Sequence, residues 1–172
     1  MIEVRVQSLG IDQASKSPVV ILQEANGERV LPIWIGPGEA SAIAMELAGM
    51  KFARPLTHDL AVSLIRGLGG KLTRVLITRV QENTYYAEML IQRGEEVFSF
   101  DARPSDSIAI ALRMQAQLFT SEELLNSNTL EVATEDSATE FRPPTQEGTR
   151  SAEELQEYLR KLNPEDLGRF NP

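Results

Sequence analysis

The chain has 172 residues, of which 42% are hydrophobic, and it carries 25 acidic against 17 basic side chains, a formal net charge of −8. This size and composition suit one globular domain with a sizeable core plus an appendage, and they exclude a wholly disordered chain. The absence of cysteine excludes a disulfide framework and removes the commonest zinc ligand. The N-terminal sequence is unlike a signal peptide and no apolar run approaches the ~18 residues of a membrane span, so we expect a cytoplasmic protein with no membrane association.

The negative charge argues against a broad nucleic-acid-binding surface, because such surfaces gain affinity from Lys and Arg contacts with phosphate. The charge is unevenly distributed along the chain. Residues 131–172 carry 10 acidic and 5 basic side chains, whereas residues 1–130 carry 15 and 12. The first 130 residues are therefore only mildly acidic, and a local basic patch is compatible with their composition.

The N-terminal third predicts strands followed by a helix. Residues 2–8 alternate apolar and polar side chains, which is typical of a half-buried strand. Residues 18–35 contain two apolar runs around the dipeptide Asn26-Gly27, which indicates a hairpin. Residues 39–50 are rich in alanine, and we expect a closely packed, buried helix there.

The next part of the chain predicts more strands and helices. A second helix follows Arg54-Pro55, carries leucines at four-residue spacing and ends at Gly69-Gly70. A third helix, apolar on most sides and therefore central, is expected at 106–115, and a capping-box pattern at 120–123 predicts a short fourth helix. Three strands are predicted at 72–80, 84–92 and 96–101. The predicted fold is of the α/β (α+β) class: a mixed, largely antiparallel sheet with helices packed on it.

The composition changes after residue 127. Residues 128–150 are rich in Thr, Glu and Pro, and their few apolar side chains predict a flexible linker. Residues 151–172 predict an amphipathic helix and a tail, with an apolar stripe formed by Leu155, Tyr158, Leu159 and Leu162. The predicted organisation is a domain at 1–127, a linker at 128–150 and a tethered helix at 151–172.

The dipeptide Arg-Pro occurs twice, each time ahead of a hydroxyl residue, an aspartate and an apolar helical run, at 53–60 and 102–109. Proline is disfavoured in the interior of a helix, so each segment predicts the start of a helix. Thr57 and Ser105 are favoured N-cap residues. The repeat predicts a gathering of cations, carboxylates and free backbone N–H groups suited to phosphate or metal chemistry. Two well-capped helices with no further role would leave the same pattern.

Three segments together resemble the bifunctional nuclease domain family: 31–40 (LPIWIGPGEA), 54–60 (RPLTHDL) and 100–109 (FDARPSDSIA). The resemblance covers roughly residues 1–130. It implies a compact α/β fold that commonly self-associates, with activity on both DNA and RNA. We therefore predict a nuclease that binds DNA and RNA through a local patch and forms a homo-oligomer, with a dimer favoured. The alternative is a non-catalytic regulatory or scaffold protein that binds a partner protein or a small anionic ligand.

Phosphodiester hydrolysis without cysteine most simply uses divalent ions such as Mg²⁺ or Mn²⁺, which take carboxylate oxygens. Arginine can hold a phosphate through two hydrogen bonds, and histidine is suited to proton transfer near neutral pH. These rules give three sets of candidates. The catalytic set is His58, Asp59 and Asp106; the phosphate-binding set is Arg54, Arg103 and Ser105; and the metal ligands are Glu39, Asp59, Asp101 and Asp106.

Each candidate also fits a structural role. A carboxylate in the first turn of a helix stabilises that helix by about 0.3–1 kcal/mol through the helix dipole. Asp101 ends an alternating strand and can pair with a nearby arginine, and both arginines can be partners in buried ion pairs. Trp34 and the Tyr85–Tyr86 pair can stack on the bases of a single-stranded substrate, or they can belong to the core.

Overall fold

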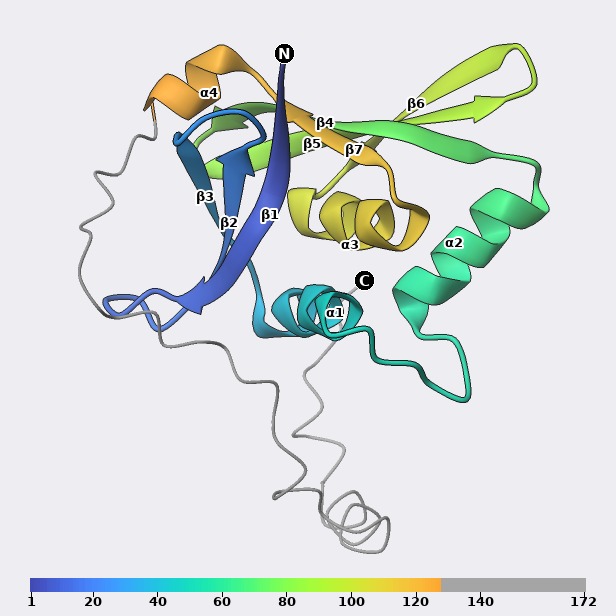
Figure 1. Ribbon diagram of the computed structural model, residues 1–172, viewed down its shortest axis with the longest axis horizontal. Helices are drawn as coiled ribbons and strands as arrows, with labels where there is room; N and C mark the ends of the chain where they lie inside the picture. The colour runs from blue at the N-terminus through green and yellow to red at the C-terminus, as the bar shows by residue number, and fades with distance from the viewer. Residues whose placement is uncertain (128–172) are drawn as a thin grey trace, which may run out of the picture. The chain divides into compact units, whose positions relative to one another are not determined.

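The computed structural model describes residues 1–127, in which helices pack on a seven-stranded sheet (Figure 1). The predicted linker at 128–150 and the predicted helix at 151–172 lie outside the described residues. None of the described helices is long and apolar enough to cross a membrane. The predicted fold class, a mixed and largely antiparallel sheet with helices packed on it, is confirmed.

Two antiparallel three-stranded units, β1–β3 and β4–β6, are joined into one sheet by β7, which runs antiparallel to β1 and parallel to β4. The strand order is β3-β2-β1-β7-β4-β5-β6. The elements are β1 (Ile2–Ile11), β2 (Pro18–Glu24), β3 (Val30–Trp34), α1 (Pro37–Leu47), α2 (Thr57–Gly67), β4 (Lys71–Gln81), β5 (Thr84–Arg93), β6 (Glu96–Ala102), α3 (Pro104–Met114), β7 (Gln117–Thr120) and α4 (Glu122–Ser127).

The predicted hairpin around Asn26-Gly27 is confirmed, because β2 and β3 pair antiparallel on either side of it. The strands predicted around residues 72–101 are also confirmed, and Gly94, with a φ of +61°, makes the turn between β5 and β6. The central strand β7 was not predicted. Its four residues are too few to show an alternation of apolar and polar side chains, so the sequence indicates only a connection between two helices.

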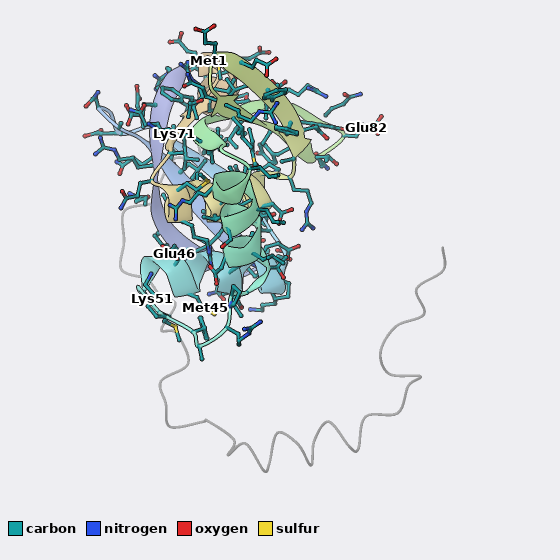
Figure 2. All side chains as sticks on the ribbon, turned by 90° about the vertical axis from the view of Figure 1, so that its right-hand side faces the viewer. Met1, Met45, Glu46, Lys51, Lys71 and Glu82 are labelled. Atoms are coloured by element: carbon teal, nitrogen blue, oxygen red, sulfur yellow. The ribbon has the colours of Figure 1, made fainter. Side chains whose placement is uncertain are left out.

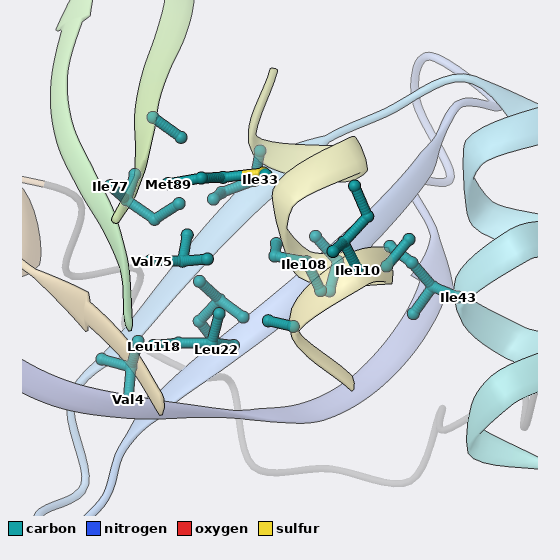
Figure 3. Packing of buried hydrophobic residues seen from close by; sticks show 14 of the residues in the cluster. Val4, Leu22, Ile33, Ile43, Val75, Ile77, Met89, Ile108, Ile110 and Leu118 are labelled. Atoms are coloured by element: carbon teal, nitrogen blue, oxygen red, sulfur yellow. The ribbon is translucent and has the colours of Figure 1, made fainter. Parts of the chain in front are cut away.

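Helix α3 lies at the centre of the core, as its apolar sequence predicted. Figure 3 shows Ile108 and Ile110 of α3 between Ile43 of α1 on one side and Leu22 and Val75 of the sheet on the other. Ile43, Ile108, Leu22 and Val75 are fully buried. Burying such an aliphatic side chain stabilises a fold by about 1.5–3 kcal/mol. These contacts therefore fix α3 between α1 and the sheet.

Helix α2 packs differently from the other two long helices. It contacts the core through buried Val62, whereas the leucines at four-residue spacing, Leu60, Leu64 and Leu68, are exposed by 51%, 57% and 74%. Gly70 lies between the end of α2 and β4, and a Cβ there would lie 2.9 Å from Cγ2 of Ile91 on β5 and 3.0 Å from the carbonyl oxygen of Ile65. Glycine therefore permits the chain to pass between α2 and β5 at this point.

The β4–β5 hairpin turns at Glu82 and Asn83, both of which have positive φ values. In Figure 2, Glu82 lies at the edge of the molecule, far from Met45 and Glu46 near the C-terminal end of α1. The opposite, N-terminal end of α1 is the one that shares a cavity with this hairpin tip.

Candidate functional site

Each of the three long helices carries a carboxylate three residues after its N-cap, in the position that faces the free N–H groups of the first turn. The prediction that Thr57 and Ser105 are N-caps is wrong. The N-caps are Leu56 and Arg103, because α2 begins one residue earlier than predicted and α3 begins two residues earlier. The N-cap and carboxylate pairs are Gly36 with Glu39, Leu56 with Asp59, and Arg103 with Asp106.

Arg103 lies at the centre of a cluster of charged groups formed by Glu39, His58, Arg103 and Asp106, which we call the Arg103 cluster. Its Nε is 2.7 Å from Oδ2 of Asp106 and its Nη2 is 3.2 Å from Oδ1. Its Nη1 donates to Oε1 of Glu39 at 2.8 Å. Nε2 of His58 lies 3.1 Å from Oδ1 of Asp106. The cluster therefore links residues at the N-termini of α1, α2 and α3, which are far apart in the sequence.

Asp106 is the charged centre that connects the guanidinium to the imidazole. Burial by itself raises the pKa of Asp106, but hydrogen bonds from Arg103 and His58 outweigh burial and leave the pKa below its usual value. The hydrogen bond with Asp106 likewise raises the pKa of Arg103. Asp106 is therefore ionised at neutral pH. It can accept a hydrogen bond from the Nε2–H group of His58, and this bond fixes the orientation of the imidazole ring.

A second arginine, Arg113, forms a separate and more buried ion pair. Its side chain is only 6% exposed, and its Nε lies 2.7 Å from Oδ1 of Asp59. Its two terminal nitrogens donate to the carbonyl oxygens of Ala109, at 2.9 Å, and Ala42, at 3.3 Å. Arg113 thus ties α1, α2 and α3 together, and Asp59 serves as its counter-charge.

The hydrogen bond from Arg113 is the main cause that holds the pKa of Asp59 below its usual value, and the backbone N–H of Leu56, 2.9 Å from Oδ2, adds to it. Sequence analysis did not single out Arg113. The signal was present, because a cation in the last turn of an otherwise apolar helix needs a buried partner.

These lowered pKa values predict how stability changes with acid. Asp59 and Asp106 both have folded-state pKa values below the unfolded value of about 3.9, so their stabilisation is complete above that value and is lost as the pH falls through the folded values. We expect the urea midpoint to fall between pH 5 and pH 2. Asp59→Asn should have a lower midpoint at pH 7 and a smaller fall with acid. An identical acid dependence for the two proteins would contradict this prediction.

The other predicted site residues lie outside the Arg103 cluster. Asp101 is exposed on β6, opposite Glu88 of β5, and Arg54 is exposed on the segment between α1 and α2. Ser105 is 6% exposed and follows Arg103 at the start of α3. The structure therefore brings together four of the eight predicted residues, namely Glu39, His58, Arg103 and Asp106.

The predicted metal ligands do not form one donor set in this arrangement. Glu39 and Asp106 both bind the guanidinium of Arg103, which lies where an ion shared by their carboxylates would have to sit, while Asp59 binds Arg113. Among residues 1–127 there is no group of three or more His, Asp or Glu side chains placed to hold a metal ion. This arrangement does not fit a resident divalent ion, and a role for Mg²⁺ or Mn²⁺ stays a prediction.

A cavity of about 250 Å³ opens beside the Arg103 cluster. It lies between the end of β3, the tip of the β4–β5 hairpin and the starts of α1 and α3. We call it the Trp34 pocket, and the side chains that give it its chemistry are Trp34, Glu39, Asn83, Tyr85, Arg103 and Ser105. An arginine, aromatic rings and two helix N-termini thus meet at one cavity, which is a combination suited to an anionic ligand with a flat apolar part.

Comparison with known proteins connects this geometry to a family. The family model described as the bifunctional nuclease domain matches residues 20–133. The chain belongs to the bifunctional nuclease domain family. The family match includes all four residues of the Arg103 cluster as well as Trp34 and Tyr85.

The relatives of this bifunctional nuclease domain protein fall into two groups. An uncharacterized protein of Mycobacterium tuberculosis is 43% identical over 165 residues, which cover 96% of this chain and 97% of the relative. A bifunctional nuclease of Oryza minuta is 24% identical over 158 residues, and bifunctional nuclease 2 of Arabidopsis thaliana is 25% identical over 122 residues. These matches cover 90% and 69% of this chain but only 45% and 37% of the two plant proteins.

Proposed function

We propose that the protein hydrolyses phosphodiester bonds in DNA and RNA at the Arg103 cluster. The family and the similarity to plant bifunctional nucleases support a nuclease. The observation that carries the proposal is the placement of Arg103 at the starts of two helices, beside an imidazole that is oriented by an ionised carboxylate. A phosphate-binding group and a proton-transfer group therefore share Asp106.

Arg103 is the group that would hold the phosphate. A guanidinium has five N–H donors, and three bonds of Arg103 to Glu39 and Asp106 are present in the described part of the chain. Its side chain is 65% exposed, so the remaining donors can reach a ligand. The N-termini of α1 and α3 add positive dipole ends at the same place. These contributions favour an anion although two carboxylates hold the arginine.

His58 is the group that would move a proton. With Nε2 bonded to Asp106, Nδ1 is the ring nitrogen that would take a proton from the attacking water or return it to the leaving oxygen, and the His58 side chain is 16% exposed. The ionised Asp106 stabilises the imidazolium that forms. Asp106 therefore positions both the phosphate-binding arginine and the base.

The test compares full-length wild type with Arg103→Ala and Arg5→Ala on fluorescent DNA and RNA oligonucleotides. We expect Arg103→Ala to lower cleavage about 10²–10³-fold, the usual loss when one preorganised donor to developing charge is removed. Arg5 is the matched control, since it is an exposed arginine that contacts a carboxylate, Glu3, at 3.8 Å outside the site. Equal cleavage by all three preparations would indicate a contaminating nuclease and contradict the proposal.

Each reaction is run with Mg²⁺, with Mn²⁺ and with EDTA. Cleavage that EDTA abolishes and either ion restores would support the predicted metal requirement. The non-catalytic alternative has a distinct outcome: the wild type would not cleave under any condition, yet Arg103→Ala would weaken retention of an anionic ligand or a partner protein.

A further inference from the structure

Trp34 is placed unusually for a strand tryptophan. It is the last residue of β3 and follows the buried Ile33, yet its own side chain is 46% exposed at the pocket. An indole that is exposed at a cavity can offer an aromatic face to a ligand.

The rest of the pocket complements a nucleobase next to a phosphate. Tyr85 lies half-buried in the lining, and burial raises the pKa of its phenol, so that it stays a neutral hydroxyl. Asn83 and Thr84 contribute an amide and a hydroxyl from the hairpin tip, which can bond the polar edge of a base. Arg103 lies in the same lining, so that a base against Trp34 and its phosphate against Arg103 would belong to one nucleotide.

The size of the cavity limits what can enter. About 250 Å³ is slightly below the ~300–1,000 Å³ range of small-molecule sites, so the cavity can take a single small unit and not a longer stretch of a ligand. In a duplex both faces of each base are covered by neighbouring bases, whereas an unpaired base can place a face on an aromatic side chain.

We infer that the Trp34 pocket binds one unpaired nucleotide by stacking its base on Trp34, so that the enzyme selects single-stranded over duplex nucleic acid. This inference rests on the proposed function, because it assigns the substrate class of the same site. Trp34 acts here as a specificity-determining residue that binds substrate and takes no part in proton transfer.

The first measurement uses Trp34 as its own reporter, since it is the only tryptophan of the chain. A nucleoside 5′-monophosphate contains no phosphodiester bond and cannot be consumed. We expect it to quench the fluorescence of the full-length protein in a saturable manner, and we expect ribose 5-phosphate, which lacks the base, to leave the fluorescence unchanged. Equal responses to the two compounds, or none to either, would overturn the inference.

The second measurement compares cleavage of a single-stranded oligonucleotide with cleavage of its duplex. We expect Trp34→Ala to lower kcat/KM on the single strand roughly 5- to 100-fold, the loss that corresponds to one stacked base, and Trp34→Phe to retain most of it. Phe52→Ala is the matched control, because Phe52 is 45% exposed and lies outside the pocket lining. If Trp34→Ala cleaves like Phe52→Ala, the inference is wrong although the nuclease proposal stands. A wild type without cleavage defeats the nuclease proposal, and the monophosphate titration then decides the binding inference alone.

Discussion

Replacing Arg113 with methionine should lower the free energy of unfolding by about 1–3 kcal/mol, because the buried guanidinium loses its bonds while the Asp59 carboxylate that remains is 34% exposed and partly solvated. Methionine keeps most of the volume but removes the charge and every donor. The carboxylates of Asp59 and, at 3.8 Å, Glu46 then lose their cation. The carbonyl oxygen of Ala42 loses the N–H donor that joins α1 to α3, and that of Ala109 loses a donor from its own helix. The measurement is urea unfolding of the full-length chain at pH 7.

Arg5→Met controls for the loss of an arginine as such, and it should change stability by less than about 0.5 kcal/mol because the side chain of Arg5 is 72% exposed. Adding Asp59→Asn to Arg113→Met should recover part of the loss, since the uncompensated charge is removed. A midpoint of Arg113→Met equal to that of Arg5→Met would show that the buried pair contributes nothing to stability.

The two arginines show why the environment, and not the residue type, decides the role. Arg113 is 6% exposed with its donors turned to groups of its own fold, whereas Arg103 is 65% exposed at the mouth of a cavity. For the same reason, loss of activity in an Asp59 variant would reflect weakened helix packing, while loss in an Asp106 variant would reflect the site itself.

Local sequence patterns were sufficient to predict much of the fold and part of the site. Some structures depend on only a few neighbouring residues, and their patterns are visible in the sequence. Examples are the turn at Asn26-Gly27, the apolar run of α3 and the two Arg-Pro segments. The Arg-Pro segments precede helices whose starts lie near one another, and there Nε2 of His58 is 3.1 Å from Oδ1 of Asp106.

The remaining features depend on contacts between residues that are distant in the sequence. The periodicity of apolar residues carries no information about such contacts. Asp59 and Asp106 both lie three residues after a helix N-cap, yet one faces Arg113 and the other faces Arg103. Asp106 meets the arginine three residues before it, whereas the packing of α2 against α3 brings Arg113 to Asp59. The position of β7 between β1 and β4 is likewise a tertiary outcome, because nothing in four residues specifies two partners from opposite halves of the chain.

Asp106→Asn should reduce kcat by about 10²–10⁴-fold, the range expected when a general base keeps its place in the chain but loses the carboxylate that orients it. The amide keeps the shape of the side chain but not its charge. Arg103 then loses its two-pronged partner at 2.7 and 3.2 Å, and His58 loses the ionised acceptor that orients its ring and stabilises its protonated form. The readout is single-turnover cleavage by the wild type and by the variant at the same pH.

Two further variants separate the roles of the cluster. Glu39→Gln removes the charge from the acceptor that bonds Arg103 at 2.8 Å but leaves the Asp106–His58 contact, so its effect on activity should be smaller and should fall on KM more than on kcat. Glu96→Gln is the surface control, because Glu96 pairs with Arg93 on exposed strands at 3.5 Å. If Glu39→Gln and Asp106→Asn lower kcat equally, the imidazole is not the proton-transfer group, and the two carboxylates act together through Arg103.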